Sequence, residues 1–205
     1  MGGTFWRRAE IPVPAAALIG VDILQKTKLE MADKEAQRKR DAELTEDEMR
    51  ENAINLAFGG DKERFERFCK ELDDRIPPGT GAVLGGSSVT GHNFKEGAPF
   101  DAEGPGSSDL DIYLIGEPAV QYFTLNGFWI PGIHSHPIKD GDEEIAPGLV
   151  PLRRDLKEIA GREVTLQASQ NFFYWFRNIW LGLPYLLLAG TLDDEEDKDA
   201  AADEL

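Results

Sequence analysis

A short apolar segment that contains two aspartates constrains this chain more than any other feature. Asp109 and Asp111 stand at i, i+2 within the run SSDLDIYLI over residues 107–115. Alternate residues of a strand point to the same face, so the two carboxylates share one face. Like charges on a half-buried face repel each other, and hard divalent ions such as Mg²⁺ bind carboxylate oxygens. The pattern therefore predicts a strand with a metal site at Asp109 and Asp111.

A second motif lies upstream, in the run AVLGGSS over residues 82–88. It predicts a short buried strand that ends in a glycine turn. Such a turn exposes backbone N–H groups and a hydroxyl, which are suited to hold phosphate. The candidate nucleotide-binding residues of the turn are Gly85, Gly86, Ser87 and Ser88. Together the two motifs indicate metal-assisted chemistry on a nucleotide.

The order of these motifs resembles the nucleotidyltransferase superfamily, which includes DNA polymerase beta and nucleotide-transferring antibiotic-resistance enzymes. The segments GSSVTG, GAPFD and SDLD, which start at residues 86, 97 and 108, are more similar still to poorly characterised bacterial nucleotidyltransferase-like domains. Several of those domains are attached to polymorphic toxins. The resemblance covers residues 61–190 and is sharpest in 86–115. It implies an α+β fold with a small mixed sheet flanked by helices.

The resemblance also implies a role for each matching residue. Gly86 and Ser87 would grip the triphosphate, and Asp109 and Asp111 would be catalytic ligands of Mg²⁺ or Mn²⁺. The loop from 92 to 106 is an insertion relative to compact members, and its lysine could approach a phosphate. Further candidate nucleotide-binding residues are Lys95 and Ser108.

The superfamily usually carries a third carboxylate on a later strand. The best candidate strand here is residues 162–167, where Thr165 occupies the expected position. Glu163 would share a face with Thr165 in an extended strand and is the candidate replacement for the missing catalytic acid. Its carboxylate would have to reach about 6–7 Å along the strand, which is two residues of rise.

Composition divides the chain into three parts. Residues 1–60 are expected to form an extended and helical arm, 61–190 the nucleotidyltransferase-like domain, and 191–205 an acidic disordered tail. Thr45 and Glu48 match a capping box that opens a helix through Phe58. Asp61 is expected to cap the next helix, in which four apolar residues form one face: Phe65, Phe68, Leu72 and Ile76.

The remaining segments give weaker signals. Helices are expected over 117–125 and 151–160, with a loop-rich segment between them. That segment holds His134 and His136, for which a polar surface loop, a shared metal and a border of the nucleotide pocket all remain open. The aromatic run over 171–189 is interrupted by Arg177, Asn178 and Pro184. The interruptions favour a buried helix on the sheet over a membrane span.

Charge and cysteine content restrict partners and compartment. The formal net charge of −16 opposes nonspecific binding to a nucleic-acid backbone. The single cysteine, Cys69, excludes an intramolecular disulfide. The first residues lack the apolar stretch of a secretory signal, so a cytoplasmic location is expected. For an effector, this would be the cytoplasm of a target cell.

The expected function is Mg²⁺-dependent transfer of a nucleoside monophosphate from a nucleoside triphosphate to an RNA, protein or small-molecule acceptor. The alternative is a catalytically inactive module of the same fold that binds nucleotide or a protein partner. A toxin or effector domain is a third hypothesis, suggested by the toxin-associated resemblance. A protein partner could bind the N-terminal helix over 21–43 or the acidic tail.

Overall fold

The computed structural model describes residues 28, 31–94 and 96–192 of the chain. Contacts divide the chain into two compact units, residues 1–40 and residues 41–205. In the first unit, residues 31–40 are helical, which agrees with that part of the helix expected over 21–43, while residues 21–27, 29 and 30 lie outside the described residues. The second unit begins at Asp41, earlier than the boundary expected near residue 60. The predicted acidic tail lies outside the described residues from 193 onward.

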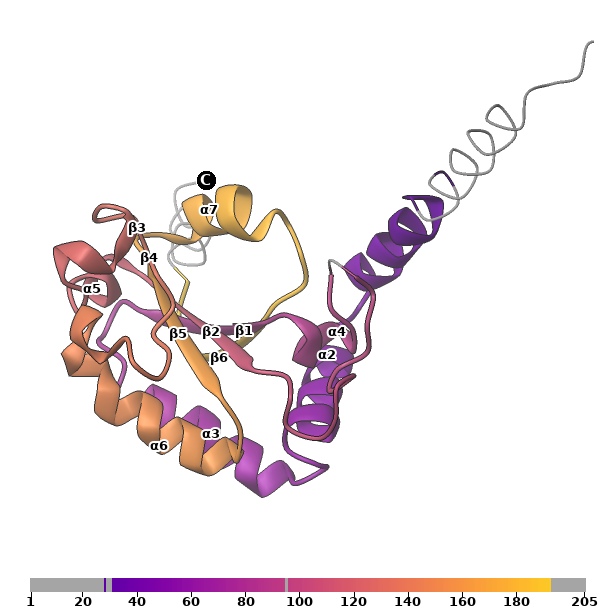
Figure 1. Ribbon diagram of the computed structural model, residues 1–205, viewed down its shortest axis with the longest axis horizontal. Coiled ribbons are helices and arrows are strands. Elements are labelled where there is room, and N and C mark those ends of the chain that lie inside the picture. Colours follow the sequence, from indigo (N-terminus) through magenta and orange to yellow (C-terminus); the bar gives the residue numbers. More distant parts are fainter. Residues whose placement is uncertain (1–27, 29–30, 95, 193–205) are drawn as a thin grey trace, which may run out of the picture. The chain divides into compact units, whose positions relative to one another are not determined.

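The second unit is α+β, and within its described residues six strands form one mixed sheet in the order β3-β4-β5-β2-β1-β6 (Figure 1). β2 is parallel to β5 and antiparallel to β1, and β6 extends the sheet beyond β1. The strands span β1 (Gly81–Gly85), β2 (Leu110–Ile115), β3 (Phe128–Ile130), β4 (His134–Ser135), β5 (Val164–Ser169) and β6 (Leu186–Gly190).

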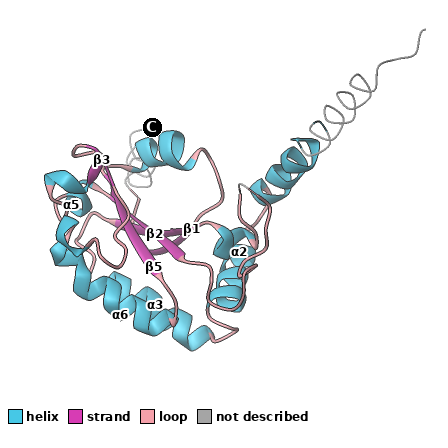
Figure 2. Cartoon of the chain, viewed as in Figure 1, coloured by secondary structure: helices cyan, strands magenta, loops and turns pink. Residues whose placement is uncertain are grey.

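Helices surround this sheet, as Figure 2 shows. The predicted capping box opens α2, since the Thr45 hydroxyl accepts from the Glu48 N–H and the Glu48 carboxylate accepts from the Thr45 N–H. Asp61 caps α3, as predicted. The helical elements are α2 (Glu46–Asn52), its π-helical continuation η1 (Ala53–Ala57), α3 (Lys62–Asp73), α4 (Ser87–Thr90), α5 (Glu117–Val120), α6 (Val150–Ala160), α7 (Phe172–Tyr174) and its π-helical continuation η5 (Trp175–Trp180).

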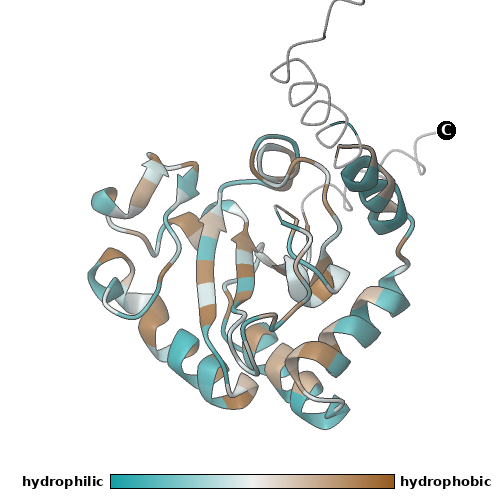
Figure 3. Ribbon diagram, turned by 45° about the vertical axis from the view of Figure 1, so that its right-hand side comes forward, coloured by the Kyte–Doolittle hydropathy of each residue, from teal (hydrophilic) through white to brown (hydrophobic). Residues whose placement is uncertain are grey.

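The main core lies between one face of the sheet and the helices α3 and α6, which pack against each other. Apolar residues of these helices alternate with polar ones along the chain (Figure 3), so each helix has one buried face. Phe58 follows η1 and is buried between Phe65 and Phe68, with ring centroids 5.4 and 5.3 Å away. The segment from α2 to Phe58 is therefore part of this core and not of a separate arm.

An aromatic cluster covers the opposite face of the sheet. Trp175 and Trp180 stack with their ring centroids 5.4 Å apart, and both rings contact Tyr113 of β2. Trp180 also lies against Gly85, where an added Cβ would come within 2.4 Å of the indole ring. Gly85 is thus required for packing.

Several predicted elements differ from the structure. The aromatic run is helical only to Trp180, and its end forms β6 because Leu186 and Leu187 pair with β1. α5 ends at Val120, earlier than expected. The segment expected to be a loop supplies β3 and β4. Among the described helices, none combines the length and the apolar composition that crossing a bilayer requires.

The burial of Phe58 leads to a first prediction. Phe58→Ala removes a ring that two other phenylalanines contact, so it should lower the free energy of unfolding by about 3–5 kcal/mol. Urea unfolding followed by circular dichroism measures this loss. Phe173→Ala is the matched control, since Phe173 is 60% exposed and its truncation should cost much less. Equal losses for the two variants would contradict the packing described here.

Candidate functional site

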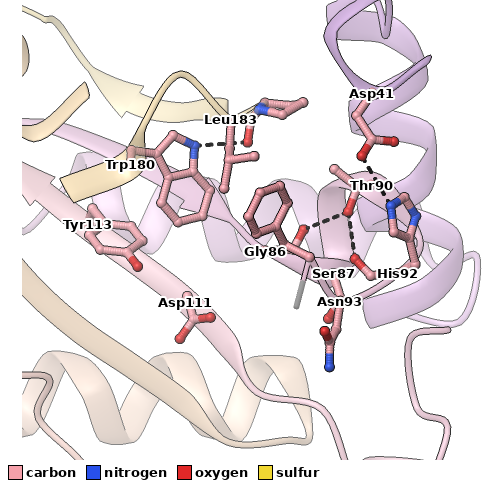
Figure 4. A pocket seen from close by; sticks show the side chains of 12 residues that line it. Asp41, Gly86, Ser87, Thr90, His92, Asn93, Asp111, Tyr113, Trp180 and Leu183 are labelled. Atoms are coloured by element: carbon pink, nitrogen blue, oxygen red, sulfur yellow. Dashed lines mark hydrogen bonds and ion pairs between the residues drawn. The ribbon is translucent and has the colours of Figure 1, made fainter. Parts of the chain in front are cut away.

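A pocket of about 400 Å³ opens where β1 ends and β2 begins. Figure 4 shows Asp111, Tyr113 and Trp180 on one side of it, with His92 and Asp41 on the other. No lysine or arginine is among the described residues that line it. The lining residues are Asp41, Gly86, Ser87, Thr90, His92, Asn93, Phe94, Asp111, Tyr113, Trp180, Leu183 and Pro184.

The predicted glycine turn lies directly beside the second aspartate. The antiparallel ladder pairs Gly85 with Asp111, so Gly86 and Ser87 follow the strand into the pocket. Gly86 has φ +78°, which favours glycine, and a Cβ there would lie 3.2 Å from Asp111 Oδ2. Ser88 is buried instead, and its hydroxyl donates to the Gly85 carbonyl at 3.3 Å. Gly86 and Ser87 are therefore the exposed part of the turn.

Asp111 is the half-buried acid of this pocket. Burial raises the pKa of its carboxyl above the usual value, and the negative charge of Asp109 raises it further. Two groups act to lower this pKa. The Thr165 hydroxyl donates a hydrogen bond to Asp111 Oδ1 at 2.9 Å, and Lys139 contributes its positive charge. Asp109 stands two residues before Asp111, so the two carboxylates are neighbours along the chain.

Asp111 and Asp109 are the residues that could hold a magnesium ion. Mg²⁺ in nucleotide-handling proteins is commonly held by one or two carboxylates, with phosphate oxygens and water as its other ligands. Asp111 is half-buried and lines the pocket, whereas Asp109 is exposed just before β2 and is not among the lining residues. In the described residues no group of three or more His, Cys, Asp or Glu side chains could hold an ion by itself.

Thr165, which stands in the sequence where the resemblance expects a third carboxylate, lies beside Asp111. The parallel ladder pairs Thr165 with Asp111. Glu163 is engaged elsewhere, because its carboxylate accepts from Arg153 at 2.9 Å and forms an ion pair with Lys157. Arg153 and Lys157 also pair with Asp140. Glu163 is not among the residues that line the pocket.

Ser108 is part of a clamp at the start of β2. Its hydroxyl accepts from the Asp101 N–H, and its own N–H donates to the Asp101 carboxylate, both at 2.9 Å. Arg162 donates to both oxygens of that carboxylate, at 3.1 and 3.2 Å, and lies over the Phe100 ring. This network fixes the chain immediately before Asp109. The hydrogen bonds of Ser108 in this network give it a structural role that needs no bound nucleotide.

The loop over 92–106 contributes His92, Asn93 and Phe94 to the pocket, whereas the sequence indicated only its lysine. A bridge between His92 and Pro99 closes its base. His92 Nε2 lies 3.1 Å from Asp41 Oδ2, and both residues line the pocket with Phe94. Lys95 lies outside the described residues.

The two histidines of the middle segment lie away from this pocket. His134 is on β4, is 2% exposed and has its Nδ1 2.6 Å from the Ser169 hydroxyl. The expectation of a polar surface loop is therefore wrong for His134. Burial lowers its pKa, as does the charge of His136, while a hydrogen bond with the Ala168 backbone opposes them. Neither histidine lines the pocket.

Comparisons with protein-family models, with curated proteins and with solved structures found no match. The functional argument for this site therefore depends on its own geometry.

Asp111 provides a prediction about stability and pH. Because the folded-state pKa of Asp111 is raised, its contribution to stability is fully present below its usual value of 3.8 and is lost as pH rises through the folded pKa. Metal-free Asp111→Asn should therefore be more stable than the wild type at pH 7, and the difference should vanish in acid. Urea unfolding in EDTA across this pH range tests it. Asp109→Asn, an exposed control, should change stability less, and a destabilised Asp111→Asn would contradict the argument.

The clamp predicts the opposite pH dependence. Burial acts to raise the pKa of Asp101, but the hydrogen bonds from Arg162, Gly106 and Ser108 outweigh it, so the pKa is lowered. Asp101→Asn should cost roughly 1–3 kcal/mol of stability at pH 7. Since a lowered pKa stabilises the fold above its usual value of 3.8 and this gain is lost as pH falls through the folded pKa, the cost should disappear in acid. Thermal unfolding at several pH values measures it, and a cost independent of pH would exclude the charge-based explanation.

Proposed function

We propose that this protein is a Mg²⁺-dependent nucleotidyltransferase, which transfers a nucleoside monophosphate from a nucleoside triphosphate to an acceptor. The observation that carries the proposal is that Gly86, Ser87 and Asp111 line one pocket, although a long loop separates the turn after β1 from β2 in the sequence. This chemistry requires a triphosphate and a divalent ion side by side, since both act on the same phosphate groups. The pocket volume of about 400 Å³ is within the range of small-molecule sites.

Each residue has a defined part in this proposal. Backbone N–H groups at Gly86 and Ser87, with the Ser87 hydroxyl, orient the terminal phosphates. Asp111 and Asp109 hold the ion, and the Thr165 hydroxyl fixes the Asp111 carboxylate. An ion held by Asp111 and Asp109 would stabilise the negative charge that develops on the leaving pyrophosphate. An acceptor hydroxyl or amine attacks the α-phosphorus, so the products are a nucleotidylated acceptor and pyrophosphate.

The charge of the protein favours a protein or small-molecule acceptor over a long RNA. The net charge is −16, and the described pocket lining includes two aspartates and no lysine or arginine. A polyanion gains affinity mainly by contacts between its phosphates and basic side chains. A small or protein acceptor does not need such contacts.

An inactive nucleotide-binding module is the second candidate, and two observations favour it. Thr165 occupies the position beside Asp111 where the resemblance expects a carboxylate, and its hydroxyl already donates to Asp111. Glu163, the candidate replacement, is paired with Arg153 and Lys157. Such a module would keep metal-dependent triphosphate binding without transfer.

The test is incubation of the protein with each α-labelled nucleoside triphosphate, Mg²⁺ and a whole-cell extract. We expect label to enter a protein or small molecule with the wild type. Asp109→Ala with Asp111→Ala should reduce transfer on the order of 100-fold or more, because it removes the proposed metal ligands. Glu63→Ala with Glu66→Ala removes the same charge from exposed positions of α3 and should leave transfer unchanged.

Parallel binding measurements separate the two candidates. Metal-dependent triphosphate binding without transfer, lost in the double aspartate variant, would establish the binding module. Absence of both binding and transfer in the wild type would refute the nucleotide site.

A further inference from the structure

The Tyr113 hydroxyl lies in the pocket without a hydrogen-bond partner among the described residues. The side chain is 9% exposed, and its ring contacts Trp175 and Trp180 with centroids 5.3 and 5.2 Å away. Figure 4 shows the hydroxyl on the edge of the ring that faces the Asp111 side of the pocket. Buried tyrosine hydroxyls usually find a partner, so an open one that lines a pocket points to a ligand.

The surroundings of Tyr113 indicate which part of a ligand it meets. Its neighbours in the lining are Trp180, Leu183 and Pro184. The Trp180 Nε1 donor is already bonded to the Pro184 carbonyl at 3.1 Å. This end of the pocket is therefore aromatic and apolar apart from the Tyr113 hydroxyl, which suits a nucleoside better than a phosphate.

The strand geometry separates this end from the proposed phosphate end. Tyr113 follows Asp111 by two residues on the same face of β2, about 6–7 Å along the strand. Asp111 pairs with Gly85 next to the glycine turn, whereas Tyr113 pairs with Val83, two residues further from the turn. A nucleotide with its phosphates at Gly86 and Ser87 can thus place its nucleoside beside Tyr113.

The hydroxyl is a hydrogen-bond donor at neutral pH. A phenol hydroxyl is protonated at neutral pH, so it can donate one hydrogen bond.

We propose that Tyr113 donates a hydrogen bond from Oη to the nucleoside part of the bound triphosphate and so contributes to its selection. This inference rests on the proposed nucleotide site. It assigns Tyr113 to the nucleoside and leaves the metal ion and the phosphates to the aspartates and the glycine turn.

Tyr113→Phe tests the assignment, since it removes only the hydroxyl and keeps the ring that Trp175 and Trp180 contact. Calorimetric titration compares wild type and variant for ATP, GTP, CTP and UTP, and for inorganic tripolyphosphate, all with Mg²⁺. We expect affinity for the preferred triphosphate to fall roughly 3- to 10-fold, in line with the loss of one hydrogen bond. Tripolyphosphate affinity and the melting temperature should not change. Tyr122→Phe is the matched control, because Tyr122 does not line the pocket.

The outcomes separate this inference from the proposed function. Unchanged nucleotide affinity in Tyr113→Phe, while the wild type binds nucleotide, overturns the assignment of Tyr113 alone. An equal loss for tripolyphosphate also overturns it, because the hydroxyl would then hold phosphate. Failure of the wild type to bind any of the four nucleotides overturns the nucleotide site and the Tyr113 assignment together.

Discussion

Strand β2 hydrogen-bonds to β1 on one side and to β5 on the other, and the registers of these two ladders decide which side chains meet at the pocket. The antiparallel ladder brings the end of β1, and therefore the glycine turn, to Asp111. The parallel ladder brings Thr165 to the same carboxylate. A shift of one residue in either ladder would turn Asp111 to the face of α3 and α6 and place Leu110 or Ile112 at the pocket.

The electrostatic character of the pocket follows from this arrangement. Asp111 is half-buried next to another carboxylate, and the described lining offers no lysine or arginine to compensate. The fold therefore retains an unfavourable charge at this point, a feature that is more common at functional sites than in structural cores. A divalent cation would relieve the repulsion, and it would also make the pocket able to accept a polyphosphate. Under the proposed function, these charges would make polyphosphate binding depend on the metal ion.

The sequence predicts those features of the structure that depend on interactions between neighbouring residues. The capping box at Thr45, the cap at Asp61, the glycine turn and the spacing of Asp109 and Asp111 are all properties of a few neighbouring residues. Long-range contacts determine the rest. Ser108 and Glu163 were candidate site residues on sequence grounds. In the structure, Ser108 is hydrogen-bonded to Asp101 and Arg162. Glu163 is paired with Arg153 and Lys157. Residues 186–190 form strand β6 and not the predicted helix. Their pairing with β1 is a long-range contact, so the local sequence does not indicate it.

Thr165 bears on both candidate functions, nucleotide transfer and nucleotide binding without transfer. Its hydroxyl donates to Asp111 Oδ1, so it orients that carboxylate and opposes the rise of its pKa that burial causes. A carboxylate in its place would add a third negative charge to an already repulsive pair, and a second ion would be needed to balance it. Under the proposed function, the hydroxyl would suit a site with one metal ion. Activation of the acceptor would then depend on the acceptor itself or on a group that it brings, and the nature of that acceptor would decide between nucleotide transfer and nucleotide binding alone.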